Sequence, residues 1–236
     1  CAQPQFLGLH RDGGYATEIR VAHPRHLFDA GDLAPEIVAP LACSGLTTYA
    51  ALKKIASSSA THAPVLIGAG GLGLMCLQLL RAQGLRMPVM VDIDPDKRKA
   101  ALAAGAAAAV DPRDADAVAQ VHAACGGAPM AVIDFVGAEP TAELALNVVG
   151  KGATIIIVGL YGGAAPWPIP MLPLKSVTIR GSYTGSLTDF GELMDLARKG
   201  AIQPIPTKVY PLTDAEDVLN LLQDGKVIGR AILAGT

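Results

Sequence analysis

Residues 63 to 80 read Ala-Pro-Val-Leu-Ile-Gly-Ala-Gly-Gly-Leu-Gly-Leu-Met-Cys-Leu-Gln-Leu-Leu, and this stretch decides the fold. A short apolar strand, Val65 to Ile67, leads into the glycines 68, 70 and 73, and an apolar helical run follows to residue 81. Gly68 suits a tight turn, Gly70 a close approach of backbone to phosphate, and Gly73 close packing of helix on strand. The free N–H groups of such a helix start attract a pyrophosphate. The pattern therefore predicts a dinucleotide site that also includes the intervening Gly71 and Leu72.

A second apolar strand, Pro88 to Asp92, strengthens this interpretation. It ends in a carboxylate 19 positions after Gly73, the spacing expected for an acid that holds the adenosine ribose hydroxyls. Glycine is 26 of 236 residues, so the glycines alone are weak support and an incidental glycine-rich turn is the alternative. The order of strand, turn, helix, strand and acid favours the dinucleotide. Asp92 also favours NAD over NADP, because a 2′-phosphate would face a like charge; Arg98 is expected to be solvated, although it leaves room for NADP.

Composition indicates a globular protein with a sizeable core. Hydrophobic residues make up 51% and charged residues 17%, and the net charge of −2 gives no support for a nucleic-acid partner. No run of 18 apolar residues and no signal-like start occurs, so a cytoplasmic protein without a membrane partner is expected. The four cysteines, at positions 1, 43, 76 and 125, form no C-x-x-C pair and predict no disulfide framework.

Strands and helices alternate through the middle of the chain. Apolar runs predict further strands at 107–111, 130–136, 153–158 and 176–181, with helices at 97–104, 114–125 (capped by Asp114) and 141–149 between them. Six such strands indicate an α/β fold, a doubly wound parallel sheet with its ligand over the carboxyl ends of the strands. Residues that follow strand ends should line that crevice: Val136, Gly159, Leu160 and Ser182.

The flanking segments are expected to form a partial, mostly β second unit. Strands are predicted at Tyr15–Val21, 207–210 and 229–233, and helices at 42–55, 187–199 and 214–224, with a polar connector at 57–62. Prolines in 161–173 predict irregular structure, as either a packed surface loop or a subunit contact. The last strand would otherwise be an exposed edge, so a homo-oligomer, dimer or tetramer, is expected there.

Four stretches together resemble the zinc-dependent alcohol dehydrogenases of the medium-chain dehydrogenase/reductase family. They are Asp12-Gly-Gly-Tyr-Ala-Thr-Glu18, Cys43-Ser-Gly-Leu-Thr-Thr-Tyr49, the glycine turn with Val91-Asp-Ile-Asp-Pro-Asp-Lys97, and Ile228-Gly-Arg-Ala-Ile-Leu233. The family's first stretch, which carries a Cys and a His ligand to the catalytic zinc, has no counterpart here. The chain resembles a truncated member with most of the N-terminal GroES-like domain absent. The resemblance implies a catalytic-domain remnant at 1–42, a Rossmann NAD-binding domain at 43–186, and a C-terminal return to the catalytic domain at 187–236.

The resemblance also assigns roles to particular residues. Cys43 matches a catalytic zinc ligand, Cys1 the last cysteine of a structural zinc lobe, and Thr47 a residue near the nicotinamide. Lys97 matches a ribose contact and Arg230 a pyrophosphate contact, where a guanidinium suits phosphate oxygens. On the residues alone, a lone cysteine before a helix is more often a buried apolar residue.

The resemblance implies an NAD- and zinc-dependent enzyme that interconverts an alcohol and an aldehyde or ketone. Since Cys43 alone cannot hold zinc tightly, this chain is expected to bind NAD without turning over alcohol. A zinc-free quinone or enoyl reductase of the same family and a non-catalytic dinucleotide-binding module remain alternatives. A P-loop is excluded, because Gly-Lys-Ser/Thr does not follow the glycines.

Overall fold

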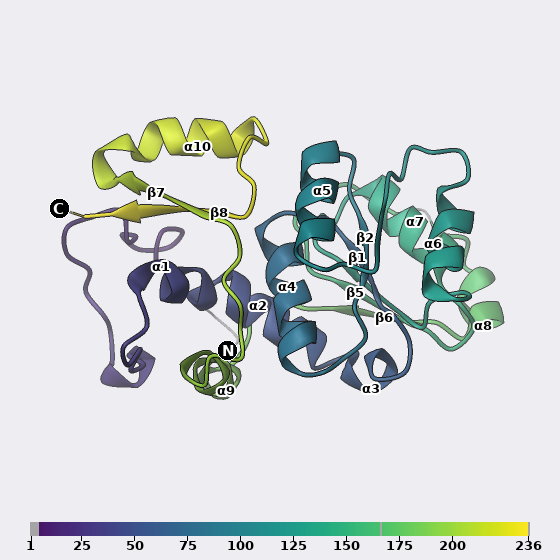
Figure 1. Ribbon diagram of the computed structural model, residues 1–236, viewed down its shortest axis with the longest axis horizontal. Coiled ribbons are helices and arrows are strands. Elements are labelled where there is room, and N and C mark those ends of the chain that lie inside the picture. Colours follow the sequence, from purple (N-terminus) through teal and green to yellow (C-terminus); the bar gives the residue numbers. More distant parts are fainter. Residues whose placement is uncertain (1–4, 166, 236) are drawn as a thin grey trace.

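The computed structural model describes residues 5–165 and 167–235. Its centre is a six-stranded parallel sheet in the order β3-β2-β1-β4-β5-β6, shown on the right of Figure 1. This is the predicted doubly wound sheet, with the strand order reversing between β1 and β4. The strands are β1 (Val65–Ile67), β2 (Val89–Val91), β3 (Ala108–Val110), β4 (Ala131–Asp134), β5 (Thr154–Ile157) and β6 (Thr178–Gly181).

Helices cover both faces of the sheet. The larger ones are α2 (Ser44–Leu52), α4 (Gly71–Ala82), α5 (Pro95–Ala103), α6 (Ala117–Cys125), α7 (Glu139–Val148) and α9 (Leu187–Arg198). Alternate strand residues point to opposite faces, so Leu66 joins the core under α2 and α4, whereas Val65 and Ile67 join the core under α6 and α7. Both cores are apolar, which is why these strands are nearly continuous apolar runs.

A smaller part lies beside the sheet domain, on the left of Figure 1. Strands β7 (Thr207–Pro211) and β8 (Arg230–Ala234) pair in parallel, and α10 (Ala215–Gln223) connects them. Helix α9 joins the two parts, because Leu193 and Met194 are buried in the core that also contains α2 and α4. The domain boundaries near residues 42 and 186 stay predictions.

Short helices complete the chain: η1 (Pro24–His26), α1 (Pro35–Val38), η2 (Ala39–Ala42), α3 (Ala56–Ser59), α8 (Met171–Lys175) and η3 (Leu212–Asp214). Two of them correct the sequence-based expectation. Helix α3 lies where a polar connector was expected at 57–62, and α8 begins inside the proline-rich 161–173 segment. Pro173 is tolerated because it occupies the first turn of α8, where its absent N–H has no intrahelical acceptor.

Two further expectations are wrong. Residues Tyr15–Val21 form bends and coil instead of a strand, because no strand of the described residues lies beside them to complete a ladder. Helix α6 begins at Ala117, with Asp116 at the N-cap position, so Asp114 is not its cap. The side chain of Asp114 instead accepts a hydrogen bond from Gln120 Nε2 at 3.2 Å.

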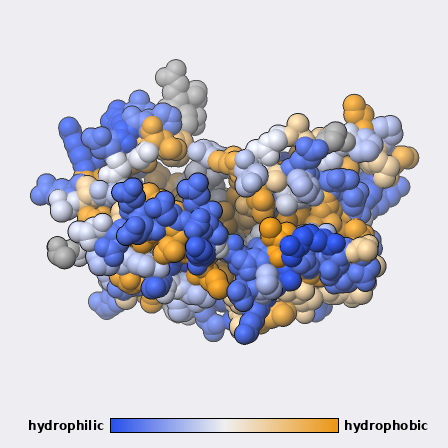
Figure 2. All heavy atoms as spheres, turned by 90° about the horizontal axis from the view of Figure 1, so that it is seen from above, coloured by the Kyte–Doolittle hydropathy of each residue, from blue (hydrophilic) through white to orange (hydrophobic). Residues whose placement is uncertain are grey.

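The surface mixes hydrophilic and hydrophobic residues, and apolar patches are visible among polar ones in Figure 2. Leu160, Tyr161 and Ile169 are exposed near the end of β5 and in the following loop. Trp167 packs inward, with Nε1 donating to the Ala142 carbonyl at 3.0 Å. Strand β6 is an edge of the sheet, and oligomer formation through it stays a prediction. No helix of the described residues has the length and apolarity needed to cross a bilayer.

Candidate functional site: a crevice at the carboxyl ends of the strands

The glycine turn connects β1 to α4. Gly68 has φ +97°, a left-handed conformation that a side chain would strain, and its N–H donates to the Val91 carbonyl at 2.7 Å. A Cβ on Gly73 would collide with the Gly68 carbonyl oxygen. A Cβ on Gly70 would meet no described atom within 4 Å. The turn is therefore tightly closed on its inner side and open in front of Gly70. Leu72 faces the core under α4.

Arg230 lies at the start of α4. A Cβ on Gly71 would stand 2.5 Å from Arg230 Nε and 2.6 Å from the Gly229 carbonyl oxygen. The guanidinium of Arg230, the first residue of β8, therefore packs on Gly71, the first residue of α4. Arg230 Nε is buried and has no hydrogen-bond partner among the described residues. Burial lowers the pKa of Arg230, while the nearby Cys43 sulfur opposes that change. A buried donor without an acceptor is costly, and an anion at the positive N-terminus of α4 would supply the acceptor.

Asp92, just after β2, ties two loops together. Its Oδ2 accepts from Ala69 N at 2.7 Å, and its Oδ1 accepts from Asp94 N at 2.9 Å. The carboxylate therefore faces the glycine turn, as an acid that contacts an adenosine ribose must. Lys97, on the first turn of α5, has its Nζ 3.8 Å from Asp94 Oδ2. The acidic and basic residues predicted for the ribose therefore lie in the loop after β2 and in the helix turn that follows it.

The residues predicted to line the coenzyme crevice follow the ends of β4, β5 and β6. A Cβ on Gly68 would stand 3.0 Å from Val136 Cγ2, and one on Gly159 would collide with the Val136 carbonyl group. Ser182 is buried, and Lys54 donates to its hydroxyl. Leu160 is 79% exposed. The structure thus places Val136, Gly159, Leu160 and Ser182 at the carboxyl ends of β4, β5 and β6, with Val136 next to the glycine turn.

Asp134 organises the segment after β4 and was not predicted. It is fully buried at the end of β4 and accepts from Val136 N at 2.8 Å, Gly137 N at 3.0 Å and Thr141 Oγ1 at 2.7 Å. A carboxylate that ends an otherwise apolar strand, as Asp92 does, was the sequence signal available for it.

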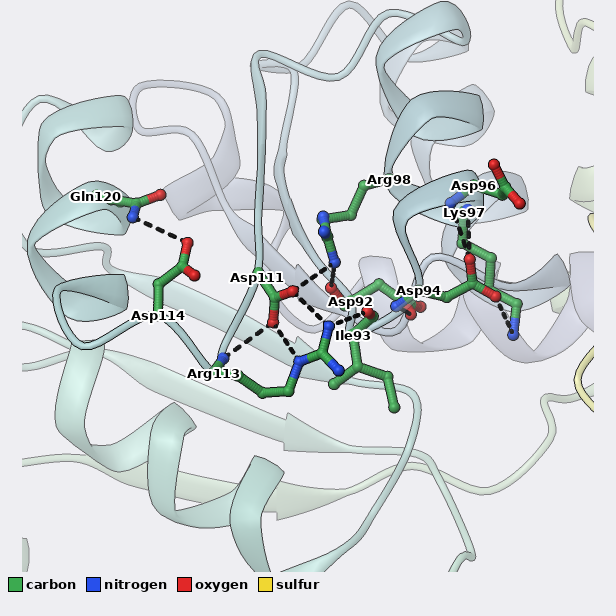
Figure 3. Close-up of polar contacts among 10 residues, drawn as sticks. All are labelled: Asp92, Ile93, Asp94, Asp96, Lys97, Arg98, Asp111, Arg113, Asp114 and Gln120. Atoms are coloured by element: carbon green, nitrogen blue, oxygen red, sulfur yellow. Dashed lines mark hydrogen bonds and ion pairs between the residues drawn. The ribbon is translucent and has the colours of Figure 1, made fainter.

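A second group missed by sequence reasoning surrounds the loop after β2 (Figure 3). Asp111, just after β3, pairs with Arg98 Nη1 at 3.0 Å and with Arg113 Nη2 at 2.6 Å. Arg98 also donates to the Asp92 carbonyl at 2.7 Å. The expectation that Arg98 is solvated is wrong, since this guanidinium is held by a carboxylate and a carbonyl.

The candidate metal ligands do not assemble. Cys43 is an exposed free thiol at the N-cap of α2, and the partly buried Thr47 donates its N–H to the Cys43 carbonyl at 3.0 Å. Within residues 5–165 and 167–235, no three His, Cys, Asp or Glu side chains are grouped to hold a metal ion. Cys1 lies outside the described residues. One thiolate does not make a zinc site, which needs at least three protein ligands, so these residues do not fit zinc.

Fold and crevice define a Rossmann-type α/β protein, and comparison with known proteins gives its family. A family model described as zinc-binding dehydrogenase matches residues 71–199. The NAD-dependent alcohol dehydrogenase of Sulfurisphaera tokodaii is 34% identical over 99% of this chain and 67% of its own length. An alcohol dehydrogenase of Geobacillus stearothermophilus is 34% identical over 96% of this chain and 66% of its own length.

Solved structures agree. The alcohol dehydrogenase of Aeropyrum pernix superposes with a TM-score of 0.85 at 33% identity, covering 97% of this chain and 67% of that one. The acetophenone reductase of Geotrichum candidum, solved in complex with NAD, gives 0.76 at 26% identity, with 86% and 56% covered. The chain belongs to the zinc-binding alcohol dehydrogenase family of medium-chain dehydrogenases/reductases. It spans about two thirds of the length of its first-ranked relatives.

Proposed function

We propose that the chain binds NAD in the crevice between the glycine turn, Asp92 and Arg230. The observation that carries the proposal is the buried, unpartnered Arg230 Nε at the start of α4. A pyrophosphate there would accept from Arg230 and from the free N–H groups of α4, with Gly70 leaving room for it. The NAD complex of a structural relative supports the same cofactor.

The order of the strands supports positions for the remaining parts of NAD. Asp92 and Lys97 would hold the adenosine ribose, and Val136, Gly159, Leu160 and Ser182 would border the nicotinamide half. Thr47, on α2, would approach the nicotinamide from the other side. NAD held by these residues would supply the hydride acceptor for the oxidation of an alcohol in the complete enzyme, and the residues themselves would bind and orient it.

The reaction of the complete enzyme is proposed to interconvert an alcohol and an aldehyde or ketone, as the names of the relatives suggest. For the 236-residue chain we propose NAD binding without alcohol turnover. The described residues offer Cys43 as one ligand and no group of three, whereas a Lewis-acid zinc needs a complete set.

Calorimetric titration of the purified chain with NAD tests the binding. We expect saturable binding that weakens at least about tenfold in Arg230→Gln, since a charge-assisted phosphate contact is lost. Arg25→Gln, which changes an exposed arginine of η1, is the matched control and should bind as the wild type does. A folded wild-type chain that does not bind NAD would overturn the proposal.

Turnover is measured separately, with primary and secondary alcohols, NAD and added Zn²⁺. We expect no NADH above the blank. NADH formation would overturn the claim of binding without turnover. Oxidation of NADPH by a quinone in the presence of a chelator would instead indicate a zinc-free reductase.

A further inference from the structure

Two arginines stand next to the ribose-binding acid, and one carboxylate holds both. Arg98 Nη1 lies 3.0 Å from Asp111 Oδ2, and Arg113 Nη2 lies 2.6 Å from the same oxygen. Arg113 Nε also donates to Asp111 Oδ1 at 2.9 Å, so the Arg113 contact is bidentate. Figure 3 shows Asp111 between Arg98 and Arg113, beside Asp92 and Ile93.

Each arginine also reaches the backbone of that loop. Arg98 donates to the Asp92 carbonyl at 2.7 Å, and Arg113 donates to the Ile93 carbonyl at 2.7 Å. Strands β2 and β3 are neighbours in register, with Val91 opposite Val110, so Asp92 and Asp111 leave the sheet side by side. Both guanidinium groups therefore contact the backbone at Asp92 or at the next residue, and the Asp92 carboxylate is the group proposed to bind the ribose.

A coenzyme with a 2′-phosphate on this ribose would need such cations. An arginine near this point is the usual partner of a 2′-phosphate, because its planar donors match phosphate oxygens. Here, however, the donors are already directed at Asp111. The Arg113 hydrogen bonds and, less strongly, Arg98 hold the pKa of Asp111 well below its usual range, so this carboxylate stays ionised throughout the neutral range and keeps its partners.

We propose that Asp111 is a specificity-determining residue, which selects NAD over NADP by withholding Arg98 and Arg113 from the 2′ position of the adenosine ribose. The inference rests on the proposed NAD site. The charge of Asp92 would disfavour a 2′-phosphate by repulsion, and Asp111 would disfavour it in a second way, by holding the arginines. Arg113 is the more accessible of the two arginines: its side chain is 64% exposed against 20% for Arg98. Without the Asp111 charge, Arg113 would lose its ion pair and keep only neutral acceptors, such as the Ile93 carbonyl, and the weaker attraction of the Asp114 charge.

The test compares NAD and NADP binding by calorimetry in wild type and Asp111→Asn. Asparagine keeps the Oδ1 acceptor, to which the backbone N–H of Arg113 donates at 3.0 Å in the wild type. The turn after β3 is therefore preserved. We expect the ratio of the NADP to the NAD dissociation constant to fall at least about tenfold, mainly through tighter NADP binding, as expected for new charge-assisted contacts to phosphate.

Asp114→Asn is the matched control. Asp114 is exposed in the same loop, accepts a hydrogen bond from Gln120 and forms no ion pair among the described residues. It loses the same charge, so any general gain in anion affinity appears in both variants. An equal shift in the two variants, or no shift in Asp111→Asn, would overturn the proposal.

Arg113→Gln in the wild-type background gives a second readout that does not depend on the folding of Asp111→Asn. If Asp111 withholds this guanidinium, the NADP-to-NAD ratio should stay within about twofold of the wild type. A selective loss of NADP affinity would mean that Arg113 already serves the phosphate, and the proposal would fail. Absence of NAD binding to the wild type is a different result, which contradicts the proposed function itself.

Discussion

Arg230 and Gly71 occupy adjoining space: a Cβ on Gly71 would stand 2.5 Å from Arg230 Nε. Gly71 begins α4 in the sheet domain, whereas Arg230 begins β8, near the end of the chain. The C-terminal strand therefore borders the glycine turn at the candidate site. The arrangement also explains why glycine stands at a position where no tight turn requires it.

Gly71→Ala should displace Arg230 and weaken coenzyme binding. The added methyl would overlap both the guanidinium and the Gly229 carbonyl oxygen, at a cost of about 1–3 kcal/mol in the free energy of unfolding. We expect the NAD dissociation constant to rise at least about tenfold, because the phosphate contact of Arg230 moves. Calorimetry and urea denaturation measure the two effects. Gly235→Ala, where a Cβ meets no described atom, is the control, and equal behaviour of the two variants would contradict the prediction.

Gly70 and Gly73 should separate binding from stability. A Cβ on Gly70 meets no described atom within 4 Å. The free energy of unfolding of Gly70→Ala should therefore lie within about 0.5 kcal/mol of the wild-type value. It should nevertheless lose NAD affinity, because the methyl takes the place of the phosphate. Gly73→Ala drives a methyl into the Gly68 carbonyl and should lose about 3 kcal/mol of stability. Gly70→Ala that binds NAD normally would mean that the pyrophosphate lies elsewhere.

The sheet could be predicted from sequence because local patterns mark its strands and its glycine turn. Apolar runs such as Val89–Val91 and Ala131–Asp134 predict strands, and together with the glycine turn and Asp92 they predict a doubly wound sheet with its ligand at the carboxyl ends of the strands. The Tyr15–Val21 expectation failed for the opposite reason. Alternation predicts a strand only where a neighbour completes its ladder, and a neighbour cannot be read from the segment itself.

The electrostatics of the site were less predictable than its backbone. Arg98 meets Asp111, and Lys53 meets Asp189, only because folding brings together residues from different elements. Asp111 ends the apolar run 107–111, as Asp92 ends its own run, but its two arginine partners cannot be read from that run. Asp134 had a local signal, as an acid ending a buried strand. The packing of Arg230 on Gly71 likewise joins residues that are far apart in the chain, and only the resemblance pointed to Arg230.

Lys175 should stabilise the sheet domain by capping α7. Its Nζ donates to the Leu146 carbonyl at 2.7 Å and to the Val149 carbonyl at 2.9 Å, where the last carbonyls of a helix lack intrahelical donors. Lys175→Met keeps the apolar stem but removes the donors, and should lower the free energy of unfolding by about 2 kcal/mol. Lys151→Met, at an exposed position, should change it by less than about 0.5 kcal/mol. Urea denaturation compares the two, and similar midpoints would show that the cap contributes nothing.

Asp189 should make the contact between α2 and α9 sensitive to acid. Lys53 Nζ lies 2.8 Å from Asp189 Oδ1 and 2.8 Å from Glu192 Oε2, and Asp189 Oδ2 accepts from Ser186 N at 2.9 Å in the capping box of α9. Burial favours the neutral acid, but the hydrogen bonds from Lys53 and Ser186 outweigh it and lower the pKa of Asp189 to about 2.

A folded-state pKa below the unfolded value of about 3.9 gives stability that is present above pH 4 and is lost as the pH falls through about 2. Asp189→Asn should therefore be less stable than the wild type by about 2 kcal/mol at pH 7, and most of the difference should disappear toward pH 2. Asp195→Asn makes the same charge change on the same helix, at an aspartate whose side chain is 60% exposed, and should show no such convergence. Urea denaturation across this pH range measures all three proteins. A wild-type advantage that persists unchanged at pH 2 would show that the Asp189 carboxylate stabilises α9 independently of its charge.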